Sequence, residues 1–208
     1  MGTEPRRHFS MFREFHLADV FTLGNAACGT GSVFAAMAFL QSGTRWLFFL
    51  AAFLCPIALV FDALDGRVAR FRHQHSILGR ELDSLADVIS FGVAPAALGF
   101  AAGLQAALDV VVLLYFVACG VSRLARFNVT AETLSAGGDK VKYFEGTPIP
   151  SSVLLAAVLA IAALGGRHGD SLWFGVVRLG PIGLHPLVMM FALSGSLMVS
   201  KTLRIPKF

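Results

Sequence analysis

The chain alternates between long apolar stretches and shorter polar connections. Each stretch is close to the about 20 residues that a helix needs to cross the hydrocarbon layer of a membrane. The fifth stretch is the shortest, and Gly165 and Gly166 follow it. The pattern predicts an all-α, polytopic membrane protein with six transmembrane helices. The six stretches cover residues 19–40, 45–66, 82–102, 106–127, 150–165 and 182–200.

Four aspartates interrupt this pattern where the second and third stretches face each other across a polar connection. A carboxylate at the centre of a bilayer costs roughly 2.5–3.5 kcal/mol, so four without compensation would cost on the order of 10 kcal/mol or more. A chain of marginal stability cannot carry that cost. We therefore expect the carboxylates to face a polar cavity and to meet cations there, as in a metal site. The four are Asp62, Asp65, Asp83 and Asp87.

The composition agrees with a membrane protein of one compact helical domain. The chain has 208 residues, of which 56% are hydrophobic and 14% charged, and its mean hydropathy is +0.71. We divide it into an N-terminal arm, residues 1–18, and a membrane domain, residues 19–208. The three cysteines fall in separate apolar stretches without ligand spacing, so they indicate neither disulfides nor a zinc site. The N-terminus has no long apolar run before a cleavage site, so a cleaved signal peptide is not expected.

Basic residues are distributed unevenly between the two sides of the predicted helices. Fourteen of the 17 lysines and arginines lie in the N-terminal arm, in the second connection, around the fourth connection or in the C-terminal tail. Because basic residues concentrate on the cytoplasmic side, both termini and the aspartate-bearing end are predicted to be cytoplasmic. The protein is then an integral membrane protein, of the inner membrane if the cell is bacterial, with membrane lipids and no nucleic acid among its partners.

The N-terminal arm mixes basic and aromatic residues. Phe9, Phe12, Phe15 and His16 have spacings that share one helical face. Such a juxtamembrane amphipathic segment can lie flat in the cytoplasmic headgroup layer. A frayed basic arm that only follows the topology rule explains the same residues equally well.

The spacing of the aspartates is that of helical pairs. Asp62 and Asp65 are three residues apart and Asp83 and Asp87 are four apart, so each pair projects from one face if both segments are helical. The eight residues between Arg70 and Gly79 allow the chain to turn and bring the two faces together. Carboxylate oxygens of this kind suit Mg²⁺ first, and Mn²⁺ or Ca²⁺ next.

Small residues and arginines accompany the aspartates. Gly66, Ala69 and Gly79 keep the surface low, so a bulky phosphate-bearing ligand can approach the backbone closely. Arg67 and Arg70 add positive charge, with a planar fork suited to bidentate contact with phosphates.

This pattern resembles the signature of the CDP-alcohol phosphotransferase family, and every position of that signature is matched. The resemblance implies transfer of a phosphatidyl or similar group from a CDP-linked lipid to an alcohol, with release of CMP. It also implies six transmembrane helices, a cytoplasm-facing polar cavity and a homodimer. By the same resemblance Asp62, Asp65 and Asp83 are ligands of two Mg²⁺ or Mn²⁺ ions, and Asp87 is either a further ligand or the general base.

Three further stretches resemble the integral-membrane phosphatidylserine synthases within this family. They are Ser84–Pro95, Arg123–Asn128 and Gly146–Pro150. The resemblance implies that the donor is CDP-diacylglycerol and the acceptor L-serine, giving phosphatidylserine and CMP. Thr147 and the Ala18-Asp19 pair depart from the subgroup's pattern, which leaves glycerol phosphate, inositol phosphate or an ether-lipid donor open.

Polar residues outside the signature have two interpretations each. Arg123 and Arg126, with Asn128 nearby, either bind the acceptor's carboxylate or a lipid phosphate, or anchor a helix end among headgroups. Thr22 and Asn25 share a helical face and either line the nucleotide pocket or make small polar contacts between helices.

A divalent-cation transporter is the alternative from another class, because intramembrane aspartates often mark ion paths. The carboxylates cluster at one end instead of being distributed across the membrane. Spans four to six contribute only Asp109 and Asp170, near their external ends. The enzyme is therefore the favoured hypothesis.

Overall fold

Helices form most of the chain, which the computed structural model describes over residues 17–72, 77–137, 143–166, 169–179, 182–200 and 204–206. The N-terminal arm that we predicted to be interfacial lies outside these residues up to position 16. The α-helices are α1 (Leu17–Ser42), α2 (Arg45–Arg72), α3 (Ile77–Asp87), α4 (Ala94–Ala102), α5 (Ala107–Gly137), α6 (Val153–Leu164) and α7 (Met189–Val199). Short helical turns are η2 (Val88–Val93), η3 (Ile149–Ser152), η4 (Gly169–Ser171) and η5 (Pro186–Val188). The strands are β1 (Tyr143–Glu145), β2 (Val177–Leu179), β3 (Ile182–Leu184) and β4 (Arg204–Pro206).

Among the described residues, four helical segments are long and apolar enough to cross a membrane, and they confirm the first four predicted stretches. The last two apolar helices, Ile149–Leu164 and Pro186–Val199, are shorter than the other four. Each falls below the about 20 residues that a typical bilayer requires, so the six-span count stays a prediction. The four long segments are Asp19–Ser42, Arg45–Val68, Leu78–Ala102 and Ala107–Thr130.

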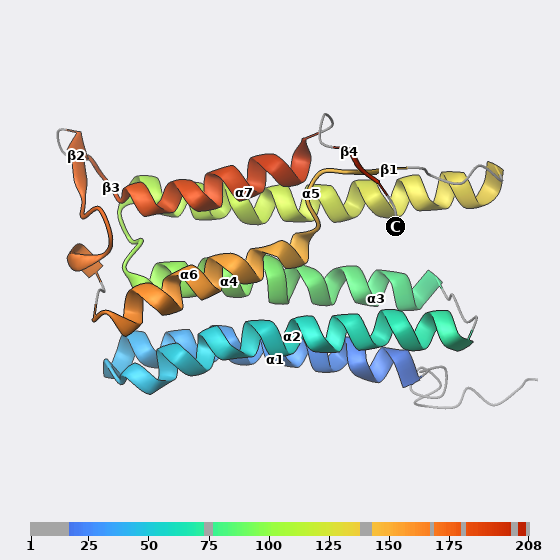
Figure 1. Ribbon diagram of the computed structural model, residues 1–208, viewed down its shortest axis with the longest axis horizontal. Coiled ribbons are helices and arrows are strands. Elements are labelled where there is room, and N and C mark those ends of the chain that lie inside the picture. Colours follow the sequence, from blue (N-terminus) through green and yellow to red (C-terminus); the bar gives the residue numbers. More distant parts are fainter. Residues whose placement is uncertain are drawn as a thin grey trace, which may run out of the picture.

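The helices are arranged in three layers (Figure 1). Helices α1 and α2 pack side by side as one layer, and α5 and α7 form the opposite one. Between them lie α3, η2, α4 and α6. The buried rings of Phe116 and Phe191 join α5 to α7 edge to face, with centroids 5.3 Å apart. The middle layer therefore meets a helix pair on both sides.

The third long segment is not a continuous α-helix. Directly after Asp87 the backbone changes to a π-helix, η2, and returns to an α-helix at Ala94. Helix α1 approaches η2 so closely that a Cβ added to Gly29 would lie 2.3 Å from Ser90 Oγ and 2.6 Å from Ser90 Cα. Only a glycine permits that approach. The backbones of α1 and η2 are thus in direct contact beside the last aspartate of the signature.

Two small antiparallel ribbons, which the sequence did not predict, accompany the helices. Strands β2 and β3 form a hairpin in which Arg178 pairs with Gly183, and it lies at the end of the bundle where α5 begins (Figure 1). Strands β1 and β4 pair Phe144 with Ile205, so the segment before η3 is tied to the C-terminal segment. Strand β3 occupies the beginning of the predicted sixth stretch, which explains why α7 is short.

Candidate active site

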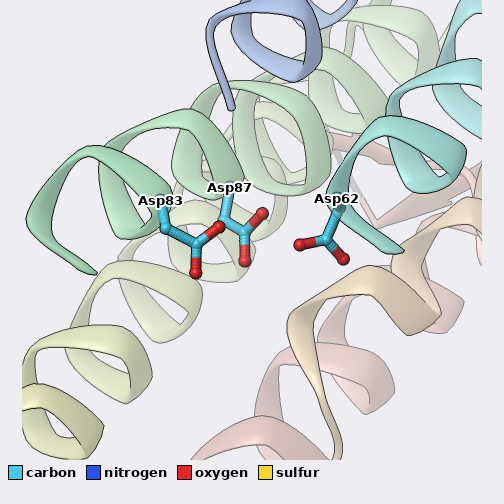
Figure 2. Close-up of side chains that lie close together, drawn as sticks. All are labelled: Asp62, Asp83 and Asp87. Carbon is cyan, nitrogen blue, oxygen red and sulfur yellow. The ribbon is translucent and has the colours of Figure 1, made fainter. Parts of the chain in front are cut away.

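Three of the four predicted aspartates converge. Asp62 projects from α2, and Asp83 and Asp87 project from α3 with the predicted separation of one helical turn. Their carboxyl groups point toward a common space between the two helices (Figure 2). One oxygen from each lies within 4.8 Å of the others. The faces of α2 and α3 that carry these aspartates therefore do meet, as predicted.

The electrostatics of this group require positive charge. Asp87 is 7% exposed, and Asp62 and Asp83 are partly buried. Two like charges this close repel by on the order of 3 kcal/mol at the effective dielectric constant of a protein site. Within the described part of the chain, Asp83 Oδ1 is buried and has no hydrogen-bond partner. Three carboxylates, one of them with an unsatisfied oxygen, are the donor set of a hard divalent cation, so the residues present fit such an ion.

Asp65 lies beside this group and has a different environment. It is 6% exposed, and its Oδ2 accepts a hydrogen bond of 2.8 Å from Thr22 Oγ1 on α1. A fifth carboxylate, that of Asp19 on α1, is 5% exposed and close enough to repel Asp65. The structure therefore arranges the predicted four aspartates as three that converge and one that faces α1.

Asp87 is also held from α1. Asn25 Nδ2 donates a hydrogen bond of 3.1 Å to Asp87 Oδ1. Asn25 is completely buried, and its own backbone oxygen accepts a hydrogen bond of 2.8 Å from Ser90 Oγ in η2. Among the described residues, Asn25 Oδ1 has no partner. Thr22 and Asn25 thus lie next to the predicted ligands, one turn apart on the same helix.

The two predicted arginines on α5 differ in their contacts. Arg123 is half-buried, is close enough to Asp87 for electrostatic attraction, and has a buried Nε without a partner in the described part of the chain. Arg126 Nη2 lies 3.5 Å from the backbone oxygen of Val199, at the end of α7. Cations favour helix C-termini, so this contact stabilises the fold, and the described residues give Arg123 no such contact.

Asn128 is engaged by α3. Its Nδ2 donates to Ser84 Oγ over 3.0 Å and lies 3.3 Å from Glu81 Oε1, while its Oδ1 accepts from Ser84 Oγ over 3.2 Å. These bonds join α5 to the face of α3 next to the aspartates. The structure therefore places Asn128 near the site with its amide bonded to neighbouring protein groups.

One small residue of the signature, Gly66, borders open space. A Cβ added to Gly66 would meet no atom within 4 Å among the described residues, so the surface there is low, as predicted. Gly79 lies in the first turn of α3. Ala69 and Arg70 belong to α2, but their side chains are outside the described part of the structure.

Asp19 and Ser90 were not predicted to contribute. Asp19 precedes Thr22 and Asn25 at the same spacing of three, so the polar face of α1 was the signal that would have identified it. Ser90 follows Asp87 by three residues, but its contact with Asn25 depends on the π-helix. No local pattern in the sequence indicates that change of backbone.

Comparison with known proteins identifies one relative over almost the whole chain and others over about half of it or more. A serine O-phosphatidyltransferase acting with CDP-diacylglycerol from Saccharomyces cerevisiae is 44% identical over 208 residues, covering 99% of this chain and 75% of the relative. The corresponding protein of Helicobacter pylori is 37% identical over 62% of this chain and 54% of its own length. An archaetidylserine synthase of Methanothermobacter thermautotrophicus is 46% identical over 48% of this chain and 41% of the relative. This chain thus spans three quarters of the yeast protein and about half of each of the other two.

A family model supplies the remaining comparison. The model for CDP-alcohol phosphatidyltransferases matches residues 15–197, which include α1 to α7 apart from the last residues of α7. All four aspartates of the signature lie inside this match. With the signature complete, three of its carboxylates brought together and most of the chain matched, the protein belongs to the CDP-alcohol phosphatidyltransferase family.

Proposed function

We propose that the protein is a membrane enzyme of phospholipid biosynthesis. It transfers the phosphatidyl group of CDP-diacylglycerol to L-serine and releases phosphatidylserine and CMP. The observation that carries this proposal is the convergence of Asp62, Asp83 and Asp87 within 4.8 Å on the family signature. The names of the yeast and Helicobacter pylori relatives support serine as the acceptor.

The carboxylates provide the metal site in this proposal. Asp62, Asp83 and Asp87 hold Mg²⁺ or Mn²⁺, and Asp65 completes the site as a ligand of a second ion. When bound, the divalent cations supply positive charge that neutralises the diphosphate and favours departure of CMP. Open space over Gly66 leaves room for the phosphate-bearing part of the donor. Arg70 and Gly79 belong to the same signature.

The acceptor reaction requires a base. The bond that forms joins the serine hydroxyl oxygen to phosphorus, and the bond that breaks joins this phosphorus to the oxygen of CMP. The proton released from the hydroxyl passes to a carboxylate oxygen. Asp87 is our choice for this base, because it is the most buried of the three converging carboxylates and lies next to Arg123.

Arg123 is the proposed contact for the serine carboxylate. Its guanidinium is near Asp87, and its buried Nε is unpartnered among the described residues. A guanidinium binds a carboxylate through two parallel hydrogen bonds. Arg126 adds positive charge on the same face of α5, and Asn128 acts by holding α5 against α3.

The membrane arrangement follows from the same proposal. Residues 19–208 form the membrane domain, with six spans, cytoplasmic termini and the carboxylates at the cytoplasmic end. The distribution of lysine and arginine supports this orientation. The family resemblance supports a homodimer around two such sites.

An ether-lipid donor is the second candidate, and the similarity to an archaetidylserine synthase over 103 residues favours it. This second candidate differs only in the lipid chains of the donor. The diphosphate of the donor, the aspartates of the site and the serine acceptor stay the same.

The test is an assay of the purified full-length protein in detergent with Mn²⁺ and radiolabelled alcohols. CDP-diacylglycerol and its dialkyl ether analogue are compared as donors. We expect a labelled phosphatidylserine with the diacyl donor, and no product after EDTA treatment. A lipid product only with glycerol phosphate or inositol phosphate would contradict serine as the acceptor. Asp62→Asn is the matched inactive variant.

A further inference from the structure

We propose that Thr22 and Asn25 are positioning residues. They set the orientation of two signature aspartates and do not themselves contact the reacting groups. Thr22 Oγ1 donates to Asp65 Oδ2 over 2.8 Å, and Asn25 Nδ2 donates to Asp87 Oδ1 over 3.1 Å. From the sequence alone, they either line the nucleotide pocket or make small polar contacts between helices. The inference deepens the proposed function and rests on it.

The two hydrogen bonds connect one helix to both halves of the signature. Thr22 and Asn25 are three residues apart on α1, whereas Asp65 is on α2 and Asp87 is at the end of α3. Helix α1 packs against both of these helices. A single helix face therefore fixes one carboxylate of each aspartate pair relative to the other.

Burial makes these bonds strong constraints. All four side chains are nearly inaccessible, with exposures of 4% for Thr22, 0% for Asn25, 6% for Asp65 and 7% for Asp87. In such surroundings a carboxylate loses much more by giving up a donor than it does at a surface. Each bond occupies one carboxylate oxygen and leaves the other oxygen directed elsewhere. The Asp87 carboxylate, although bonded to Asn25, still belongs to the three carboxylates that converge.

Direct binding of a phosphate would compete with these contacts. The Thr22 hydroxyl has one hydrogen, which is directed to Asp65. A phosphate oxygen would have to displace that carboxylate to accept it. Asn25 Nδ2 has one hydrogen besides the one donated to Asp87, whereas Asn25 Oδ1, which is unpartnered among the described residues, is an acceptor and repels a phosphate oxygen.

The position of Asn25 is itself fixed by the π-helix. Ser90 Oγ donates to the backbone oxygen of Asn25 over 2.8 Å, and Gly29 allows α1 to touch η2. Ser90, which lies three positions after Asp87, therefore holds Asn25 by its backbone oxygen. This arrangement is typical of the outer-shell groups that orient a metal ligand.

The experiment separates the hydrogen bonds from the packing. Thr22→Val and Asn25→Leu keep the approximate shape of each side chain and remove its donor. Mn²⁺ binding is measured by electron paramagnetic resonance on the full chain, alone and with CDP. We expect the Mn²⁺ affinity and kcat to fall by about 10- to 100-fold in both variants. The KM for CDP-diacylglycerol should change by less than about threefold, because no substrate contact is lost.

Two further variants serve as controls. Thr22→Ser retains the hydroxyl and should have the Mn²⁺ affinity and the kcat of the wild type. Ser32→Ala removes another buried α1 hydroxyl that bonds to a neighbouring helix, through its 2.8 Å contact with Ala51 O. It should lower the thermal unfolding temperature as much as Thr22→Val does and leave Mn²⁺ affinity unchanged.

The outcomes distinguish the two proposals. Suppose that the wild type makes no lipid product while Thr22→Val still binds Mn²⁺ more weakly than the wild type does. In that case the positioning role stands and the proposed function fails. If Thr22→Val and Asn25→Leu raise the KM for CDP-diacylglycerol at unchanged Mn²⁺ affinity, they bind substrate and the positioning role is wrong. A wild-type chain without Mn²⁺ binding overturns both.

Discussion

Asp109 and His185 lie 76 residues apart in the sequence and form a buried pair, with His185 Nδ1 2.6 Å from Asp109 Oδ2. Asp109 also accepts hydrogen bonds from the backbone nitrogens of Ala106 and His185. The pair joins the beginning of α5 to the turn that leads into α7, at the end where the β2–β3 hairpin lies (Figure 1). It fixes the layer of α5 and α7 without contact to the carboxylates.

Breaking this pair should destabilise the protein and leave the chemistry intact. Asp109→Ala leaves a buried imidazole and two backbone donors without their acceptor, so we expect a loss of about 3–5 kcal/mol in unfolding free energy. Asp109→Asn, which keeps one acceptor oxygen, should lose less. Thermal unfolding in detergent and kcat at low temperature provide the measurements. An Asp109→Ala protein as stable as the wild type would contradict the structural role.

The convergence of three carboxylates predicts opposite effects of one substitution with and without metal. Asp83→Asn removes one charge from the repelling group, so the metal-free variant should be more stable than the wild type by on the order of 3 kcal/mol. Mn²⁺ at 100 times its dissociation constant should stabilise the wild type by about 2.7 kcal/mol, and the variant by much less at the same concentration.

Thermal unfolding with EDTA and with Mn²⁺ measures both effects. Leu85→Ala, at an exposed position on the opposite side of α3, provides a control that keeps all carboxylates. If Asp83→Asn lowers stability without metal and binds Mn²⁺ as tightly as the wild type, Asp83 is not a ligand.

Arg123 should be needed for the acceptor. A hydrogen bond between charged groups contributes about 1.5–3 kcal/mol, so Arg123→Ala should raise the KM for L-serine by about 10- to 100-fold. Arg126→Ala should have a smaller effect, because that side chain already contacts Val199 O. Initial rates at varied serine and varied CDP-diacylglycerol give the two constants separately.

Arg45 provides the matched arginine. Its Nη2 donates to the backbone oxygen of Ala163 over 3.0 Å, at the C-terminus of α6, and it lies at the other end of α2 from Asp62. Arg45→Ala should leave both Michaelis constants unchanged. A rise in the KM for CDP-diacylglycerol alone in Arg123→Ala would assign Arg123 to the donor phosphates instead.

The contact between α1 and η2 predicts a difference between two glycines. A Cβ at position 29 would lie 2.6 Å from Ser90 Cα, whereas a Cβ at position 31 would lie 3.3 Å from the flexible end of Leu54. Gly29→Ala should therefore cost about 1–3 kcal/mol of unfolding free energy and lower kcat, since it moves Asn25 away from Asp87. Gly31→Ala should be nearly neutral in both measurements. Equal stability of the two variants would mean that α1 and η2 separate without cost.

The long helices and the meeting of the aspartates were predictable because each depends on local spacing. Apolar runs of about 20 residues set the first four spans, and separations of three and four place aspartates on single helical faces. The choice of Asp62, Asp83 and Asp87 over Asp65 was not predictable. It depends on how far α1 and α2 are rotated relative to each other, which no spacing within one helix determines.

The last third of the chain shows a second limit of the sequence pattern. Residues 182–200 are mostly apolar, yet Ile182–Leu184 form strand β3, and Pro186 begins a short 3₁₀ turn before α7. Apolar composition cannot distinguish a hairpin that covers a bundle from the first turn of a helix. The pairing of β3 with β2 decides between them, and that contact is made only in the folded chain.

The π-helix between Asp87 and Ala94 constrains how the length of this segment can vary. A π turn contains one residue more than the α turn that it replaces. Loss of a single residue from 88–93 would therefore let the segment become a regular α-helix while α3 and α4 keep nearly the same faces toward their partners. The same loss within α3 or α4 would rotate everything on one side of it by about 100° about the helix axis, and the carboxylate of Asp87 or the apolar face of α4 would leave its partners. One-residue changes of length are therefore tolerated more readily in η2 than in the α-helices beside it.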